Sequence, residues 1–228
     1  MTALAVLSIA VFVTCGAWQW NRGVARQAVW QDFATDAAPT IDPGMQALEA
    51  LPRFTRVRLE GRYDGEHQIL LDNRTHAGRA GYEVLTPFEL HDGRLVLVNR
   101  GWVPFTGYRD RLPDVALAGT TGSVTVTGRV DTLPVQGMAA GHAAPDPDAS
   151  WPKLTSYPRH DELVAVLGRA VETRQVLLDA DAPDGYIRQW QAPGIPPERH
   201  FSYAAQWWLF AATVAVLYVI LNLHKTDR

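Results

Sequence analysis

Two uncharged apolar stretches, one at each end of the chain, constrain the fold more than any other feature. Residues 1–21 and 201–223 contain no Asp, Glu, Lys, Arg or His. As a helix, the second stretch would be about 35 Å long, enough to cross a hydrocarbon core of about 30 Å. Both stretches are therefore predicted to be transmembrane helices, at 1–21 and 200–223, surrounded by membrane lipid.

A cleaved signal peptide is the alternative for the first stretch, because it too would be apolar and N-terminal. Signal peptides begin with basic residues and end in small ones, whereas this stretch begins uncharged and ends in Trp18-Gln19-Trp20 before Arg22. Tryptophan is typical of the membrane surface, where a span would end. These features favour a membrane helix that is retained.

Flanking charges indicate the orientation of the two spans. Lys225 and Arg228 lie in the tail, 224–228, and basic residues favour the cytoplasmic side of a membrane. Both termini are then cytoplasmic, and the residues between the spans lie outside. Arg22 and Arg26 run against this rule, although long translocated segments count little in it. We recognise no transit peptide and expect a bacterial plasma (inner) membrane.

Residues 22–199 are expected to form one mainly β domain outside the membrane. The segment "FTRVRLEGRY", 54–63, alternates apolar and polar residues as half-buried strands do. Asp92-Gly93 lies between two apolar runs and predicts a hairpin with a tight primed turn. "RHDELVAVLGRA", 159–170, predicts one short helix. The stretch 132–150, rich in Pro, Gly, Ala and Asp, predicts a mobile loop.

The predicted fold class is therefore a membrane protein of the α+β type. Two terminal transmembrane helices flank a mainly β extracytoplasmic domain, which closes into a small barrel or sandwich with one short helix. The chain has 21 Lys+Arg against 24 Asp+Glu, so nothing in it resembles a basic nucleic-acid footprint. No common catalytic motif or nucleophile-base pair is recognisable, and we expect no enzymatic activity.

His200 stands at the start of the second apolar stretch, in "ERHFSYAAQWW". On an α-helix, His200, Tyr203 and Trp207 share one face, with Gln206 on its flank. An imidazole there could coordinate a haem iron, with the macrocycle against the neighbouring aromatic side chains. The alternative is a histidine at the membrane surface with its ring nitrogen in water. Helix geometry alone favours the alternative.

Arginine and tryptophan residues mark two further candidate sites. Trp18, Arg22 and Arg26 are spaced by four and form a stripe at the end of the first span. If the two spans pack together, Arg22 would lie beside His200 and pair either with Glu198 or with a haem propionate. In the central domain, the segments "DNRTHAGRAGYEVLTPF" and "VNRGWVP" are rich in Arg, Asn, Gly and aromatic residues. They form either a turn with a core tryptophan or a partner surface, whose residues would be Arg74, Arg100 and Trp102.

These motifs together resemble the Surfeit locus protein 1 family, the assembly factors of haem-copper cytochrome c oxidase. The resemblance rests on "GAWQWNR" in the first span, the two segments just quoted, and "HFSYAAQWW" in the second span. It covers nearly the whole chain, and the order and spacing of the motifs make the combination specific. The long Pro- and Ala-rich loop and the uncharged N-terminus depart from the expected pattern.

The resemblance implies a non-enzymatic role in maturing oxidase subunit I, by binding haem a transiently and helping its delivery or insertion. It implies that His200 is the iron ligand. Subunit I and other oxidase assembly factors would be the partners. The remaining cofactor-binding candidates, carried over more loosely as an inter-helix face, are Tyr203, Gln206, Trp207, Trp18, Gln19 and Arg22. The alternative is a haem-free membrane scaffold that stabilises subunit I or recruits other assembly proteins.

Overall fold

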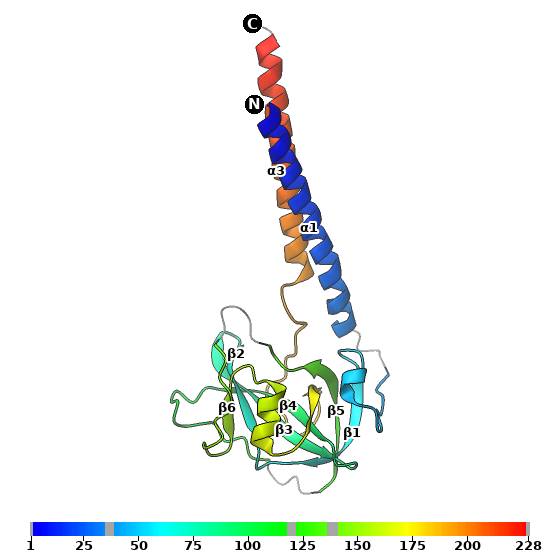
Figure 1. The fold of residues 1–228 in the computed structure, drawn as a ribbon, viewed down its shortest axis with the longest axis vertical. Helices are drawn as coiled ribbons and strands as arrows, with labels where there is room; N and C mark the ends of the chain where they lie inside the picture. The colour runs from blue at the N-terminus through cyan, green and yellow to red at the C-terminus, as the bar shows by residue number, and fades with distance from the viewer. Residues whose placement is uncertain (1, 35–38, 118–121, 136–140, 227–228) are drawn as a thin grey trace. The chain divides into compact units, whose positions relative to one another are not determined.

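The computed structural model describes residues 2–34, 39–117, 122–135 and 141–226, and side chains as far as residue 222. The chain divides into two compact units (Figure 1). One is formed by the two ends of the chain, residues 1–36 and 191–228, and the other by residues 37–190. The predicted domain boundaries at 22 and 199 therefore fall inside the first unit, because both terminal helices extend past their uncharged stretches.

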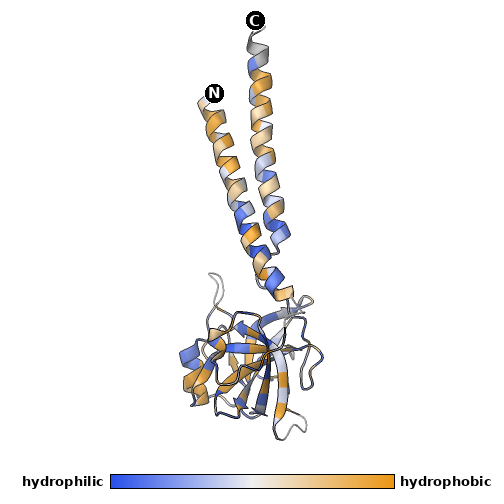
Figure 2. Cartoon of the chain, turned by 90° about the vertical axis from the view of Figure 1, so that its right-hand side faces the viewer, coloured by the Kyte–Doolittle hydropathy of each residue, from blue (hydrophilic) through white to orange (hydrophobic). Residues whose placement is uncertain are grey.

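Two long helices form the first unit, α1 over Thr2–Ala34 and α3 over Pro197–Thr226. They lie side by side and antiparallel, since Tyr218 near the end of α3 donates a hydrogen bond to Thr2 at the start of α1 (3.0 Å). Both are long and apolar enough to cross a membrane. Figure 2 shows that the N-terminal half of α1 and the C-terminal half of α3 are the most apolar parts. The prediction of two terminal apolar helices is confirmed.

Local sequence explains where these helices begin and continue. Pro197 occupies the first turn of α3, where its fixed φ suits the helix and its missing N–H costs no hydrogen bond. Glu198 follows it, and a negative charge in the first turn is favourable to the helix dipole. α1 continues through Arg22 and Arg26, because arginine has a high helix propensity and its charge can remain in water beyond the apolar stretch.

The second unit is a small β-barrel with a two-strand extension. Its strands are β1 (Arg56–Tyr63), β2 (Ile69–His76), β3 (Arg79–Leu90), β4 (Leu95–Pro104), β5 (Val124–Thr132), β6 (Lys153–Thr155) and β7 (Val171–Leu178). The sheet order is β1-β5-β7-β4-β3-β2-β6, and β1 also pairs with β3. Five strands therefore close into a ring, which decides between the barrel and the sandwich.

The barrel interior is filled from all five ring strands. Val57, Phe88, Val98, Val130 and Val176, one from each strand, belong to a single buried cluster. A second cluster covers the outside of β2, β3, β4 and β7, and α2 (His160–Leu167) seals it with Leu163, which is fully buried. The predicted short helix is thus confirmed. It ends at a left-handed Gly168, the usual way for a helix to stop.

The hairpin between β3 and β4 is confirmed, but its turn is not the predicted one. Leu90 N–H bonds to Arg94 O (2.9 Å), so three residues lie in the loop, and only Gly93 among them has a positive φ of 83°. Asp92 instead accepts a hydrogen bond from the backbone N–H of Arg94 (3.0 Å). An aspartate that bonds the backbone two residues on favours this longer turn over a two-residue one.

Part of the predicted mobile loop is tied down. Residues 136–140 lie outside the described residues. Beyond them, the Lys153 ammonium donates hydrogen bonds to the carbonyl oxygens of Asp146, Pro147 and Ala149, at 2.6, 2.9 and 2.8 Å. A buried ammonium needs several acceptors, so this segment is held to β6.

Candidate cofactor site on the helix pair

The two terminal helices approach each other closely at two glycines of α1. A Cβ on Gly16 would lie 2.3 Å from Trp208 Nε1, and a Cβ on Gly23 would lie 2.5 Å from Phe201 Cε1. Gly16 and Gly23 are the buried residues of α1, seven positions apart, as are Trp208 and Phe201. Small residues let membrane helices pack closely, and here each glycine receives one aromatic ring.

His200 lies in this interface. Its ring is half-buried, and Nδ1 lies 2.9 Å from Oε1 of the Gln19 side chain on α1. Ala204, one turn along α3, is fully buried against α1 and leaves room for the ring. This hydrogen bond joins residues 181 positions apart in the chain and connects the two helices at their polar end.

Aromatic rings line the rest of the interface. Trp207 stacks on Phe12 of α1, with ring centroids 5.7 Å apart. On the other side, Trp20 packs against Phe201 (4.8 Å) and Trp208 (5.8 Å). Such contacts stabilise a helix pair beyond the area that they bury. Trp207 is thus an inter-helix residue, as the family resemblance implies.

The other predicted cofactor residues are exposed on the surface of the two helices. Tyr203 and Trp18 are 49% and 56% exposed, and Gln206 is exposed too. The Arg22 guanidinium lies over the Trp18 ring, 5.8 Å from its centroid, and no ion pair between Arg22 and Glu198 is found among the described residues. These exposed side chains, here called the accessible rim, lie near Gln19 or His200 along their own helices, and the structure does not bring them into the interface itself.

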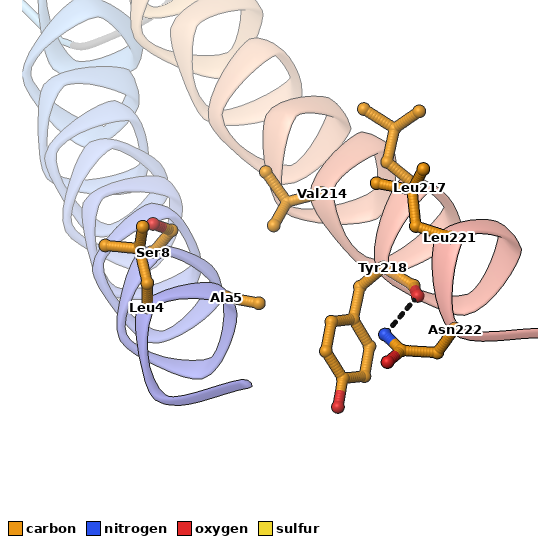
Figure 3. A pocket seen from close by; sticks show the side chains of 8 residues that line it. All are labelled: Leu4, Ala5, Ser8, Val214, Leu217, Tyr218, Leu221 and Asn222. Atoms are coloured by element: carbon orange, nitrogen blue, oxygen red, sulfur yellow. Dashed lines mark hydrogen bonds between the residues drawn. The ribbon is translucent and has the colours of Figure 1, made fainter. Parts of the chain in front are cut away.

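A groove opens at the other end of the helix pair, where α1 and α3 separate (Figure 3). Its volume is about 420 Å³, and it is lined by Leu4, Ala5, Ser8, Val214, Leu217, Tyr218, Leu221 and Asn222. Asn222 Nδ2 donates a hydrogen bond to the Tyr218 carbonyl oxygen (2.7 Å). The lining is mainly apolar and lies more than three helical turns from His200, so it belongs to a different part of the molecule.

The expected partner surface of the β domain is largely buried. Arg100 is only 2% exposed and donates to Gln68 Oε1 (2.9 Å), to Val115 O (3.1 Å) and to Asp184 O (2.6 Å). Its guanidinium also lies 5.0 Å from the Tyr186 ring centroid. Arg100 is therefore a structural hub inside the domain and cannot contact a partner directly.

Arg74 is the more accessible member of that set. Its side chain is 18% exposed, lies over the Tyr157 ring at 5.4 Å, and approaches Glu83 only to 4.0 Å. Its Nε and Nη2 atoms are buried without a hydrogen-bond partner among the described residues. Trp102 is 6% exposed and covers Gly81, as a core tryptophan would.

The sequence alone did not identify the glycines as contact points. The signal was the seven-residue spacing of Gly16 and Gly23, matched by Ala204 and Ala211 on α3, which are also buried. Glycine in an apolar stretch is common, however, and the spacing becomes informative only when the partner helix is known. Gln19 is the other residue that gains importance, from a loose candidate to the partner of His200.

Comparison with known proteins identifies the family of this chain. A model of the SURF1 family matches residues 6–212. A SURF1-like protein from Monosiga brevicollis is 26% identical over 245 aligned residues, which cover 98% of this chain and 88% of that protein. One from Dictyostelium discoideum is 43% identical over a short segment of 49 residues, 22% of this chain and 18% of that protein. The chain belongs to the SURF1 family, a family of cytochrome c oxidase assembly factors.

Proposed function

We propose that this protein binds haem a through His200 and assists its delivery or insertion into subunit I of haem-copper cytochrome c oxidase. The observation that carries the proposal is the His200 ring, whose Nδ1 is engaged by Gln19. Its Nε2 has no recorded partner among the described residues. A half-buried imidazole with one hydrogen-bonded nitrogen has the other nitrogen left to coordinate, as an axial haem ligand requires.

The residues present fit such a group. A porphyrin supplies four nitrogens to its iron, so the protein needs to add only an axial ligand. The described residues contain no group of three or more His, Cys, Asp or Glu side chains that could hold a bare metal ion. One imidazole therefore suits a haem better than it suits an isolated cation.

The accessible rim would complete the site. Arg22 is exposed, and its guanidinium would pair with a haem propionate, as a planar fork pairs with carboxylates. Tyr203, Gln206, Trp207 and Trp18 would offer aromatic and polar contacts around the macrocycle. Only Trp207 is fixed in the helix interface. An open rim suits transient binding, since a fully enclosed cofactor would leave slowly.

The location follows from the helix pair and its flanking charges. We place the protein in a bacterial plasma membrane with both termini in the cytoplasm and the β domain outside. His200 would then lie near the outer surface of the membrane, close to where the apolar part of α3 begins. Its role is non-enzymatic: it holds and releases a cofactor for subunit I and works beside other assembly factors.

Haem retention by a His200→Ala variant tests the proposal. The wild-type protein and the variant are purified in detergent from cells that make haem a, with His91→Ala of the β domain as a matched control. We expect the wild type and His91→Ala to retain haem a and His200→Ala to lose most of it. Retention by His200→Ala at the wild-type level would exclude this residue as the ligand.

A haem-free scaffold is the second candidate, and Arg74 is the observation that favours it. Its side chain is 18% exposed and approaches Glu83 only to 4.0 Å, so a carboxylate of another protein could pair with the exposed part of the guanidinium. If this candidate is correct, Arg74→Met impairs oxidase assembly whereas His200→Ala leaves it intact. If haem binding is the function, His200→Ala has the stronger effect.

A further inference from the structure

We infer that Gln19 is a positioning residue that holds His200 as an iron ligand and sets the strength of the bond. The inference rests on the proposed function, because it needs His200 to be the ligand. Gln19 Oε1 and His200 Nδ1 are 2.9 Å apart, within normal hydrogen-bond distance. Among the described residues, Gln19 makes the only hydrogen bond to the imidazole, so this bond selects the orientation of the ring within the packed interface.

The hydrogen bond fixes which ring nitrogen is free. An amide oxygen can only accept, so Nδ1 must carry the proton of the neutral imidazole. The lone pair of the ring is then on Nε2, the atom that points away from Gln19. A neutral histidine without this partner would exchange between its Nδ1–H and Nε2–H tautomers, and its ring would rotate about the terminal torsion. Gln19 therefore prepares the ring before any ligand arrives.

Packing on both sides of Gln19 holds it in place. Gln19 lies three residues after Gly16 and four before Gly23, and all three share one face of α1. Trp208 and Phe201 press on these two glycines with no space for a side chain between them. The amide oxygen is thus carried by a segment that cannot shift along α3, and the distance to His200 is set by helix packing.

The chemical consequence is a stronger axial ligand. A histidine that donates its second N–H to an acceptor is more basic at the coordinating nitrogen, and loss of such an acceptor typically lowers metal affinity about 10- to 100-fold. The surroundings, at the edge of the apolar part of the helix pair, strengthen the hydrogen bond relative to water. Affinity would in turn depend on helix pairing, because the acceptor and the ligand come from different helices.

The haem-free protein gives a first test. The full chain is labelled with ¹⁵N-histidine and its spectrum recorded in detergent micelles at a pH where histidine is neutral, with the His200 signal assigned by its loss in His200→Ala. We expect the Nδ1–H form for wild type and a mixture of both forms for Gln19→Leu. Gln27→Leu, the same change at an exposed site of α1, should behave as wild type. An Nε2–H form in wild type would overturn the inference.

Haem a titration and redox measurement give the second test. We expect Gln19→Leu to bind haem a about 10- to 100-fold more weakly, with a higher midpoint potential of the bound iron. Gln19→Glu keeps an acceptor, should restore affinity to within a few-fold of wild type, and should lower the potential. These two shifts in opposite directions are not expected from a merely structural role.

The outcomes separate the inference from the proposed function. Wild-type affinity in His200→Ala would overturn the function itself. Loss of binding in His200→Ala together with unchanged affinity and potential in Gln19→Leu would overturn the role of Gln19 alone. If Gln19→Leu does not fold, the potential of Gln19→Glu and the wild-type ¹⁵N spectrum decide.

Discussion

Single residues in the barrel interior show how this small domain accommodates polar groups. Tyr63 is buried, its hydroxyl has no hydrogen-bond partner among the described residues, and burial raises its pKa far above the usual range. Arg100 lies nearby and lowers that pKa in part, but the loss of hydration dominates. The folded domain therefore favours the neutral phenol.

This arrangement predicts how stability depends on alkaline pH. The pKa of Tyr63 is higher in the folded than in the unfolded protein. The stability that comes from keeping this phenol neutral is therefore fully present below about pH 10 and is lost as pH rises above that value. We expect Tyr63→Phe to weaken the alkaline loss of stability and to change the free energy of unfolding at neutral pH by no more than about 1 kcal/mol. Unfolding by denaturant across this pH range measures both quantities. An unchanged pH slope in Tyr63→Phe, equal to that of the exposed control Tyr108→Phe, would contradict the account.

Arg100 illustrates where sequence alone falls short at this scale. Its neighbours in "VNRGWVP" indicate a turn or a surface, and arginine is rarely fully buried, so exposure was a reasonable expectation. The acceptors that make its burial possible come from residues 68, 115 and 184, far apart in the chain. The sequence left Trp102 open between a core residue and a partner surface, and its 6% exposure shows that it belongs to the core.

Among the secondary-structure elements, the helix pair depends on glycine. The rings of Trp208 and Phe201 occupy the space where a side chain at Gly16 or Gly23 would lie. In a membrane there is little hydrophobic gain from bringing two helices together, so close packing and aromatic contacts supply most of the attraction. The pair is then specific in register as well as in partner.

A glycine substitution tests this view of the helix pair. We expect Gly16→Leu to cost about 1–3 kcal/mol through overpacking, to lower the thermal midpoint in detergent, and to lower haem retention because Gln19 is displaced. Ala17→Leu adds the same side chain at the next, exposed position and should change neither the thermal midpoint nor haem retention. Equal behaviour of the two variants would show that the close contact at Gly16 is unimportant.

Sequence patterns predicted the elements better than their partners. The two apolar helices, the alternating strands, the β3–β4 hairpin and α2 could all be recognised, because each has a local period or a turn signal. Closure of the barrel through β1 and β3 could not, since alternation assigns the faces of a strand but not its neighbours. The Gln19–His200 contact is of the same kind, because it joins the two ends of the chain.

At the scale of the whole molecule, the two ends of the chain come together as one pair of apolar helices. The β domain is an insertion between two helices that pair with each other, so the start of α1 and the end of α3 lie at the same end of the pair (Figures 1 and 2). If that end is cytoplasmic, the whole inserted domain must be outside. Orientation is therefore a single choice for the entire protein.

Cysteine labelling in intact cells tests the orientation. In a Cys15→Ser background, we expect Met45→Cys, which replaces an 80% exposed side chain of the β domain, to react with a membrane-impermeant maleimide. Asp227→Cys in the predicted cytoplasmic tail should react only after the cells are made permeable. The reverse pattern would place the β domain in the cytoplasm and would remove His200 from the outer surface.

Ligand rescue is the most direct test of the central claim that His200 coordinates haem iron. In His200→Gly the imidazole is absent, and small free imidazole can enter the space that it leaves. We expect the purified variant to show weak haem a binding with an altered absorption spectrum, and added imidazole to restore the wild-type spectrum. A wild-type spectrum of His200→Gly without imidazole would contradict the account.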